Sequence, residues 1–351
     1  MSTYSVPSPA ADVAAPPAAL EDQLETHRRA LTGYCYRMLG SWFEAEDAVQ
    51  ETMVRAWRGA EGLHSRPALR SWLYRIATNV CLDALQGAKR RARPMDLADP
   101  MTADSTLDTG LPDQAWLQPA PDSRVLPAGN DPADAAVARE TIRLAFVAAL
   151  QHLPPRQRVV LILRTVLHWR AAEVAELLET SVASVNSALQ RARATLDGLD
   201  LDGVAPPEMD DAHTELLERY VDAFERYDVD ALVALLHEDA TFCMPPYKLW
   251  LRGPKEVAGW LRGTGAGCHG SRLVPTTVNG CPAFGAYRKS LDEDDVHVPF
   301  SLAVLEIADG RIVGIHNFLD PELFRRIGLP MRLEGGTTRP LVPLPGPTAA
   351  H

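Results

Sequence analysis

Several hallmarks of membrane and secreted proteins are missing from this sequence. No run of about eighteen or more apolar residues occurs, which excludes an ordinary transmembrane helix. Residues 1–20 lack a basic stretch followed by a compact apolar stretch, so they predict a flexible Pro/Ala-rich tail and no signal peptide. We therefore expect a cytoplasmic protein that does not associate with a membrane.

Cysteine is also scarce. The 351 residues include five cysteines, namely Cys35, Cys81, Cys243, Cys268 and Cys281. None belongs to a C-x-x-C pair, and no group of His and Cys has the spacing of zinc ligands, so the sequence predicts neither a metal site nor a cofactor. We favour buried free thiols, because unpaired cysteine is among the most buried residue types. A redox switch is the alternative.

Positive charge is in short supply overall but is concentrated locally. Lys and Arg number 35 against 46 Asp and Glu, a net charge of −11. Residues 66–93 nevertheless contain seven Arg and Lys and a single acid, Asp83. Residues 95–134 show the reverse, with eight Asp opposed only by Arg124. This sorted distribution predicts a local nucleic-acid footprint that the net charge conceals.

The segment over residues 21–93 is predicted to be helical. The stretch EAEDAVQETMVRAW (44–57) places small and apolar residues on one helical face, and Asp47, Gln50 and Glu51 lie off it. A break containing Gly62 and Pro67 precedes a second helix. Residues 94–135 are rich in Pro, Asp, Ala and Gly and show no period, so we expect an acidic, mobile linker there.

The second helix combines aromatic and basic residues. Trp72, Tyr74 and Arg75 precede Asn79. Aromatic and basic side chains together can hold unstacked single-stranded bases, which makes this helix a candidate site for single-stranded DNA. The alternative for Trp72 is a place in the core.

Residues 136–199 are predicted to be helical and to end in a helix-turn-helix. The stretches RAAEVAELLET and SVASVNSALQRARATL meet at Thr180–Ser181, where Ser181 can cap the second helix. Asn, Gln and Arg side chains pair with base edges in the major groove. Two packed helices without a DNA-binding role are the alternative. The candidate DNA-reading residues are Ser184, Asn186, Ser187, Gln190, Arg191 and Arg193.

After a short linker at residues 200–207, residues 208–330 change character, and residues 331–351 form a predicted loose tail. Helical patterns give way to alternating runs, and the ADGR turn (308–311) predicts a hairpin, so we expect an α+β domain. No paired motif brings its polar groups together, so we expect no enzyme activity. The candidate acid–base residues would be His237, Asp239, Tyr247, His297, His316 and Asp320.

Three motifs carry a resemblance to a known family. YRMLGSWFEAEDAVQETMVRAWRG, LRSWLYRIATNVCLDAL and LPPRQRVVLILRTVLHWRAAEVAELLETSVASVNSALQRARATL look like regions two and four of bacterial sigma factors of the extracytoplasmic-function group. The resemblance covers about residues 21–93 and 136–197. Residues 208–330 resemble SnoaL-like domains, partly through DPELF. The implied fold is multidomain, with two all-α helical domains followed by an α+β, cone-shaped SnoaL-like domain.

The resemblance implies that this protein binds core RNA polymerase, through its β′ clamp helices and β flap, and directs promoter-specific transcription initiation. It assigns clamp-helix binding to Asp47, Gln50 and Glu51. It assigns duplex reading of the distal promoter element to the helix over residues 181–196. The residues that would capture flipped bases of the element nearest the start site are Arg66, Arg70, Trp72, Arg75 and Asn79.

The sequence departs from the family pattern in the helix-turn-helix turn, where Glu179 replaces the usual glycine. A non-glycine residue there predicts a strained backbone or a wider turn. The negative net charge is consistent with a DNA-binding protein that gains its selectivity only within the polymerase complex.

The resemblance also implies that the C-terminal domain regulates the sigma part in cis, aided by the high effective concentration of a tethered domain. An unknown small ligand is a further candidate partner. The residues expected to line its cavity are Tyr247, Trp250, Trp260, His316 and Phe318. The alternative is a polymerase-independent DNA-binding regulator fused to a SnoaL-like enzyme.

Overall fold

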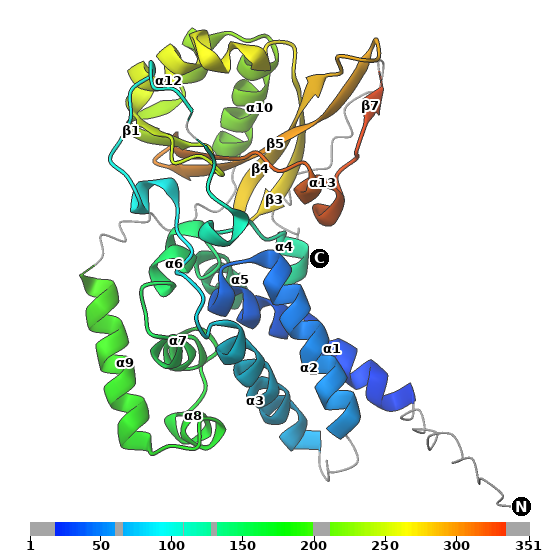
Figure 1. Cartoon of the computed structure of the whole chain (residues 1–351), viewed down its shortest axis with the longest axis vertical. Coiled ribbons are helices and arrows are strands. Elements are labelled where there is room, and N and C mark those ends of the chain that lie inside the picture. The colour runs from blue at the N-terminus through cyan, green and yellow to red at the C-terminus, as the bar shows by residue number, and fades with distance from the viewer. Residues whose placement is uncertain (1–17, 60–65, 108, 128–131, 199–210, 335–351) are drawn as a thin grey trace, which may run out of the picture.

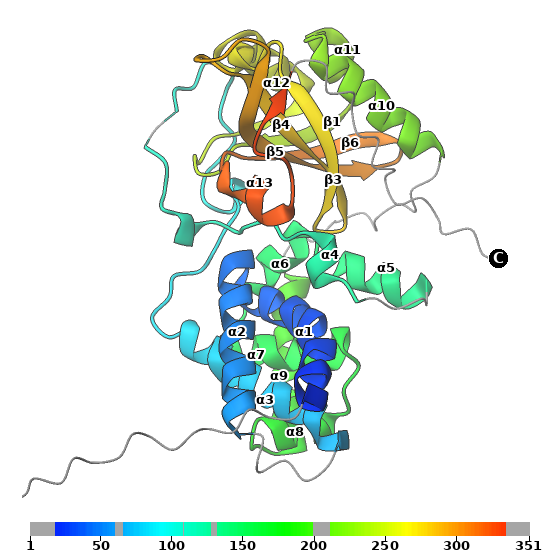
Figure 2. The same ribbon diagram turned by 90° about the vertical axis from the view of Figure 1, so that its right-hand side faces the viewer.

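The computed structural model describes residues 18–59, 66–107, 109–127, 132–198 and 211–334. The expected linker at residues 200–207 and most of the two expected tails lie outside these residues. The described chain forms a helical half and a half built on a β-sheet, which lie against each other (Figures 1 and 2). None of the described helices is long and apolar enough to cross a membrane.

The first part of the helical half consists of α1 (Ala18–Leu39), α2 (Trp42–Gly59) and α3 (Arg66–Ala84). The predicted stripe on α2 is confirmed, because its small and apolar residues are buried against α1 and α3. The buried residues of α2 are Trp42, Ala45, Ala48, Val49, Thr52, Met53 and Ala56. The polar face of the same helix therefore points to solvent.

The second part of the helical half packs onto the first. One continuous core joins Leu31 and Leu73 of the first part to Val159, Leu163 and Val185 of the second. The two parts of the helical half thus share one hydrophobic core in this arrangement. The elements are α5 (Pro132–Glu140), α6 (Leu144–Leu150), α7 (Pro155–Leu161), the π-helical turn η4 (Ile162–Val166), α8 (Ala171–Leu177) and α9 (Val182–Asp197).

The prediction of a mobile linker over residues 94–135 is wrong for its described part. The segment contains the short helices η2 (Pro94–Asp96), η3 (Asp113–Ala115) and α4 (Asp122–Val125), and α5 begins within it. Trp116, Leu117 and Ala120 are almost fully buried. A few well-placed apolar side chains anchor the segment, so its Pro- and Asp-rich composition was a poor guide to its order.

The C-terminal half is built on one mixed sheet with the strand order β2-β1-β6-β5-β4-β3, and β7 pairs with β5. β1 and β6 run parallel, and the other neighbours are antiparallel. The strands are β1 (Leu236–Cys243), β2 (Trp250–Arg252), β3 (Arg272–Val278), β4 (Cys281–Lys289), β5 (Val296–Ala308), β6 (Arg311–Phe318) and β7 (Leu333–Glu334). The pairing of Ala308 with Arg311 confirms the predicted hairpin.

The two faces of this sheet have different partners. On one face, Tyr220, Trp260 and Phe284 belong to a core that the helices cover. On the other face, Val278 and Phe318 pack with Leu144 of α6 in the helical half. The helices of this half are α10 (Asp211–Glu225), α11 (Val229–Val233), α12 (Gly253–Arg262), η5 (Thr264–Cys268) and α13 (Glu322–Ile327).

Candidate functional site

The outer face of α2 presents the three predicted polymerase-binding residues. Asp47, Gln50 and Glu51 are all exposed, and Glu51 forms an exposed ion pair of 2.7 Å with Arg55. Gln50 also lines a hollow of about 600 Å³ between α1 and α2. Its other lining residues include the apolar Leu24, Met53, Val54 and Trp57 and the charged Glu21, Asp22, Glu25, Arg28 and Arg58. This surface combines an apolar floor with a charged rim, which is typical of a protein interface.

The predicted base-capturing helix, α3, presents only part of its expected set to solvent. Arg70 and Asn79 are exposed, Trp72 is half-buried, and the side chain of Arg66 lies outside the described residues. Tyr74 belongs to the core instead, because its ring packs 5.2 Å from that of Tyr34. Tyr74 therefore cannot hold a base in this arrangement.

Two arginines of α3 contact the helix-turn-helix part. The Arg70 guanidinium lies 5.2 Å from the ring centroid of Trp169, and Arg75 Nη2 donates a hydrogen bond of 3.3 Å to the Glu176 carbonyl in α8. The two candidate promoter-binding surfaces thus lie side by side, with α8 against α3 (Figure 1). The sequence did not predict this contact.

The helix-turn-helix forms without a glycine in its turn. Glu179 adopts a left-handed backbone conformation, with φ of 51°. The strained-backbone expectation is therefore the one observed. Ser181 caps α9 as predicted, since its hydroxyl accepts a hydrogen bond of 3.1 Å from the Ser184 amide.

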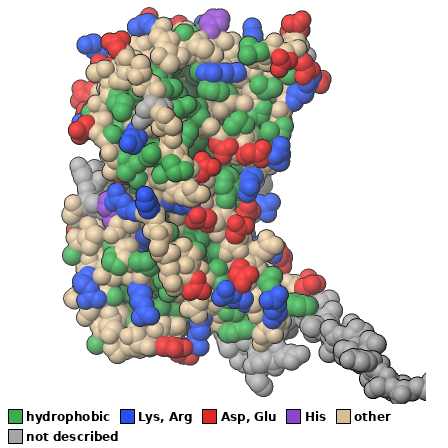
Figure 3. Space-filling model, in the orientation of Figure 1, with side chains coloured by type: hydrophobic (Ala, Val, Ile, Leu, Met, Phe, Trp, Pro, Cys, Tyr) green, Lys and Arg blue, Asp and Glu red, His purple; other side chains and the backbone are tan. Residues whose placement is uncertain are grey.

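The expected reading face of α9 is exposed along its length. Val185, Leu189 and Leu196 are buried against the neighbouring helices, whereas Val182 is 42% exposed. On the face of the molecule seen in Figure 3, acidic and basic side chains are interspersed over both halves. The six exposed candidates are Ser184, Asn186, Ser187, Gln190, Arg191 and Arg193.

The residues expected to line a ligand cavity do not surround one space. Tyr247 and Trp260 pack in the core under the helices, whereas Phe318 lies in the cluster that faces the helical half. His316 is two residues from Phe318 on β6 and shares its side of the sheet, since side chains alternate along a strand. Trp250 instead donates its indole N–H to the Ala98 carbonyl at 2.8 Å.

The remaining acid–base candidates are scattered over the C-terminal half. Asp239 is exposed at the side of His237, and Asp320 accepts a hydrogen bond from the Glu322 amide at the start of α13. His297 lies at the other end of the sheet, where its Nε2 is 3.1 Å from the Gly270 carbonyl. These residues form no acid–base constellation. Among the residues that the structure describes, no cluster of His, Cys, Asp and Glu could hold a metal ion.

A turn of the C-terminal half enters the helical half and was missed by sequence reasoning. Asn279, between β3 and β4, is fully buried and hydrogen-bonds to three separate segments. Its amide nitrogen donates to Tyr36 Oη of α1 at 2.7 Å and to the Ile142 carbonyl at 2.5 Å. Its side-chain oxygen accepts from the Ala120 amide at 2.9 Å. The Asn-Gly dipeptide, a strong turn signal, could have pointed to the turn but not to its partners.

The next residue extends this contact. The Gly280 amide donates to Asp122 Oδ1 at 2.8 Å, and a Cβ atom on Gly280 would lie only 2.9 Å from the Arg139 carbonyl. Burial raises the pKa of Asp122 to about 6, although the Gly280 amide and nearby arginines act to lower it. Asn279 and Gly280, here called the latch turn, therefore contact both helical parts. They also contact the segment over residues 94–135, here called the connecting segment.

Comparison with known proteins agrees with these observations. The sequence profile of Sigma-70 region 2 matches residues 24–91, that of Sigma-70 region 4 matches residues 143–196, and that of the SnoaL-like domain matches residues 217–315. The crystal structure of the extracytoplasmic-function sigma factor SigJ from Mycobacterium tuberculosis superposes with a TM-score of 0.56 at 25% sequence identity. The match covers 90% of this chain and 100% of that one.

Two curated relatives align over most of their lengths. The extracytoplasmic-function RNA polymerase sigma factor SigG of Mycobacterium tuberculosis is 45% identical over 311 residues, which cover 87% of this chain and 82% of SigG. SigJ of the same organism is 30% identical over 314 residues, covering 86% and 92% of the two chains. This chain therefore belongs to the extracytoplasmic-function family of RNA polymerase sigma factors and has a fused SnoaL-like domain.

Proposed function

We propose that the C-terminal domain inhibits this sigma factor in cis by holding regions two and four in a closed arrangement. The buried latch turn carries the proposal. Asn279 bonds at once to α1 of region two, to the connecting segment and to the entry of region four. A tethered domain needs only weak contacts to stay bound, because its effective concentration is high.

The polymerase-binding surface remains available in this closed arrangement. We assign Asp47, Gln50 and Glu51 to the β′ clamp helices, because all three are exposed next to the hollow between α1 and α2. Region four would meet the β flap. A first encounter with core polymerase can then precede the release of region four from region two.

Promoter recognition, in contrast, requires the arrangement to open. We assign base capture to Arg66, Arg70, Trp72, Arg75 and Asn79, and duplex reading to the exposed face of α9. In the closed arrangement Arg75 is bonded to the Glu176 carbonyl of α8. The two promoter elements lie apart on the DNA, whereas the α3–α8 contact holds together the two surfaces that would bind them. A closed molecule therefore cannot engage both elements at once.

The alternative function, a polymerase-independent regulator with an enzymatic domain, finds less support. The acid–base candidates of the C-terminal half do not converge, and the polar face of α2 is the surface that a sigma factor needs. We propose a regulatory and not an enzymatic role for this half, in the cytoplasm where core polymerase acts.

The test is run-off transcription with core polymerase, on promoters selected from a random library. We compare Asn279→Ala and Gly280→Ala with Asp309→Ala and Gly310→Ala. The two controls alter a second Asn/Asp-Gly turn with nearly the same positive φ values, but a Cβ on Gly310 would meet nothing within 4 Å. The backbone cost is therefore matched, and of the two turns only the latch turn contacts the sigma part.

We expect Asn279→Ala to raise transcription about tenfold or more, because several hydrogen bonds of about 1 kcal/mol each are lost from the closed state alone. Asp309→Ala should behave as the unchanged protein. A chain ending at Gly198 should still fold, because the helical core lies within residues 24–196. Since it lacks the C-terminal half altogether, it should be at least as active as Asn279→Ala. Equal or lower activity of both latch variants and of the shortened chain would reject inhibition in cis.

A further inference from the structure

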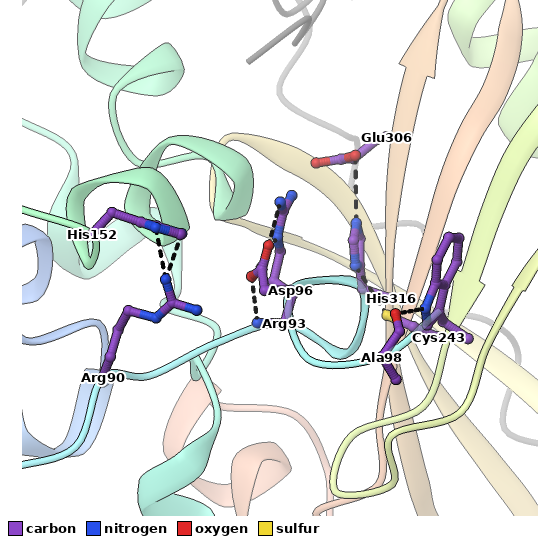
Figure 4. A network of polar contacts seen from close by, with 9 residues as sticks. Arg90, Arg93, Asp96, Ala98, His152, Cys243, Glu306 and His316 are labelled. Carbon is purple, nitrogen blue, oxygen red and sulfur yellow. Dashed lines mark hydrogen bonds and ion pairs between the residues drawn. The ribbon is translucent and has the colours of Figure 1, made fainter. Parts of the chain in front are cut away.

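Three polar side chains converge on the covered face of the sheet. Cys243 of β1 lies opposite His316 of β6, and Glu306 of β5 lies opposite Gly314 of β6. Cys243 Sγ is 3.2 Å from His316 Nδ1, and His316 Nε2 is 3.4 Å from Glu306 Oε2. The imidazole thus stands between a thiol and a carboxylate (Figure 4). A nucleophile, a base and a group that orients the base form the pattern of an activated thiol.

The surrounding charges stabilise a protonated ring. Burial acts to lower the pKa of His316, but Cys243 and Glu306 outweigh it and raise that pKa to about 10. Burial likewise acts against ionisation of Glu306, yet His316 and Arg143 lower its pKa to about 2. Arg143, from the helical half, lies 3.9 Å from Glu306. His316 therefore holds a proton within the site, 3.2 Å from the Cys243 sulfur.

Other cysteines lack this environment. Burial raises the pKa of Cys281 to about 12, and a hydrogen bond with Cys35 together with burial raises the pKa of Cys81. Cys268 faces a guanidinium, that of Arg288, at 3.2 Å. Among the cysteines that the structure describes, Cys243 is the one whose hydrogen-bond partner is a histidine.

The connecting segment and the helical half cover the site. Cys243 is 1% exposed and His316 is 2% exposed. The Ala98 carbonyl accepts a hydrogen bond from Trp250, which pairs with Cys243, and Met101 pairs with Leu251. Residues 98–101 therefore follow β2 at the edge of the sheet. Departure of the C-terminal half from the sigma part would uncover this face, whereas in the closed arrangement a dissolved oxidant has no contact with the sulfur.

We propose that Cys243, His316 and Glu306 form a reactive-thiol site for hydroperoxides, which opening of the sigma factor exposes. The timing rests on the proposed closed arrangement, and the chemistry rests on the three side chains. In the reactive state the thiol proton resides on His316 Nδ1, in a thiolate–imidazolium pair, and the sulfur attacks the terminal oxygen of the peroxide. An S–O bond forms and the O–O bond breaks, so the sulfur is oxidised and the peroxide reduced. The leaving oxygen takes the proton from His316 and departs as an alcohol or water, and Cys243 becomes a sulfenic acid.

The product gives the site a regulatory consequence. A sulfenic acid adds one oxygen atom between β1, β6 and the covering segment, where the thiol is 1% exposed. Reclosure over this larger polar group leaves it without room or a full set of partners, which opposes burial. An open molecule that has been oxidised therefore stays open and active until two thiols reduce it, the first forming a mixed disulfide with release of water and the second releasing Cys243 as the thiol.

The experiment treats full-length protein with hydrogen peroxide and dimedone, alone and bound to core polymerase and promoter DNA, and measures adducts at each cysteine by mass spectrometry. The accessibility of each thiol is measured in parallel by its alkylation with iodoacetamide, on native samples without denaturant. Cys281 is the internal control, because it lies on the same covered face beside Leu144 but has no histidine at hydrogen-bond distance among its described contacts. His316→Gln, with its melting temperature recorded, tests activation of the thiol.

We expect the Cys243 dimedone adduct to form roughly tenfold faster in the polymerase complex than in the free protein, and roughly tenfold faster than the Cys281 adduct there. His316→Gln should remove the advantage over Cys281. If iodoacetamide reaches Cys281 in the complex while peroxide does not modify Cys243 preferentially, the molecule opens but the thiol site is rejected. If neither thiol gains access in the complex, the opening itself is absent and both proposals fall.

Discussion

At the scale of single residues, Glu179 occupies a backbone conformation that its residue type disfavours. Its φ of 51° lies in the left-handed region, which costs an L-residue with a side chain roughly 1 kcal/mol relative to glycine. The side chain is exposed, so little is lost by removing it. We expect Glu179→Gly to raise the free energy of unfolding by about 1 kcal/mol, as measured by urea denaturation.

The matched control is Glu176→Gly, three residues earlier on the exposed side of α8. There the backbone is right-handed helix, so glycine should lower stability by about 1 kcal/mol. Opposite signs for the two substitutions are the expected result. A destabilising effect of Glu179→Gly would show that its side chain makes a contribution larger than the backbone strain.

At the scale of elements, the contact between α4 and the latch turn should respond to pH. Asp122, the first residue of α4, has a pKa of about 6, raised by burial from 3.8. A folded-state pKa above the unfolded one means that folding takes up a proton between these values. Stability therefore falls as the pH rises from about 4 to about 6, by at most about 3 kcal/mol.

Asp122→Asn removes this titration and keeps an oxygen acceptor for the Gly280 amide. We expect its melting temperature to exceed that of the unchanged protein at pH 7 and to converge with it near pH 4. Asp113, exposed in η3 on the same connecting segment, provides the control substitution Asp113→Asn. An equal response of the two variants to pH would contradict the assigned role of Asp122.

At the scale of the whole molecule, a net charge of −11 opposes binding to DNA outside the polymerase complex. Phosphate contacts dominate unspecific affinity, and the exposed candidate residues of α9 include two basic ones, Arg191 and Arg193. We expect gel shifts of the free protein at moderate salt to give a dissociation constant above about 1 µM without sequence preference. Addition of core polymerase should produce promoter-specific complexes. Tight, sequence-specific binding by the free protein would refute this account.

Local pattern predicted much of the helical half. The apolar stripe of α2, the cap at Ser181 and the exposed face of α9 follow from spacing of about 3.6 residues, which depends only on neighbours along the chain. The ADGR hairpin likewise follows from its two turn residues. The segment around Trp116 was mistaken for mobile chain, because its order depends on contacts with helices that lie far away in the sequence. The predicted roles of the polymerase- and promoter-binding residues stay predictions until the variants are measured.

The sequence by itself determined the elements, their polar and apolar faces and the family, since these are encoded in short-range periodicity and in three motifs. The tertiary structure alone decided which faces meet. Strand order and register placed Phe318 and Trp260 on opposite sides of one sheet, brought Cys243 to His316 and Glu306, and carried Asn279 into the helical half. A shift of one residue in register would reverse the face of every side chain on a strand, and that register is fixed by contacts far apart in the chain.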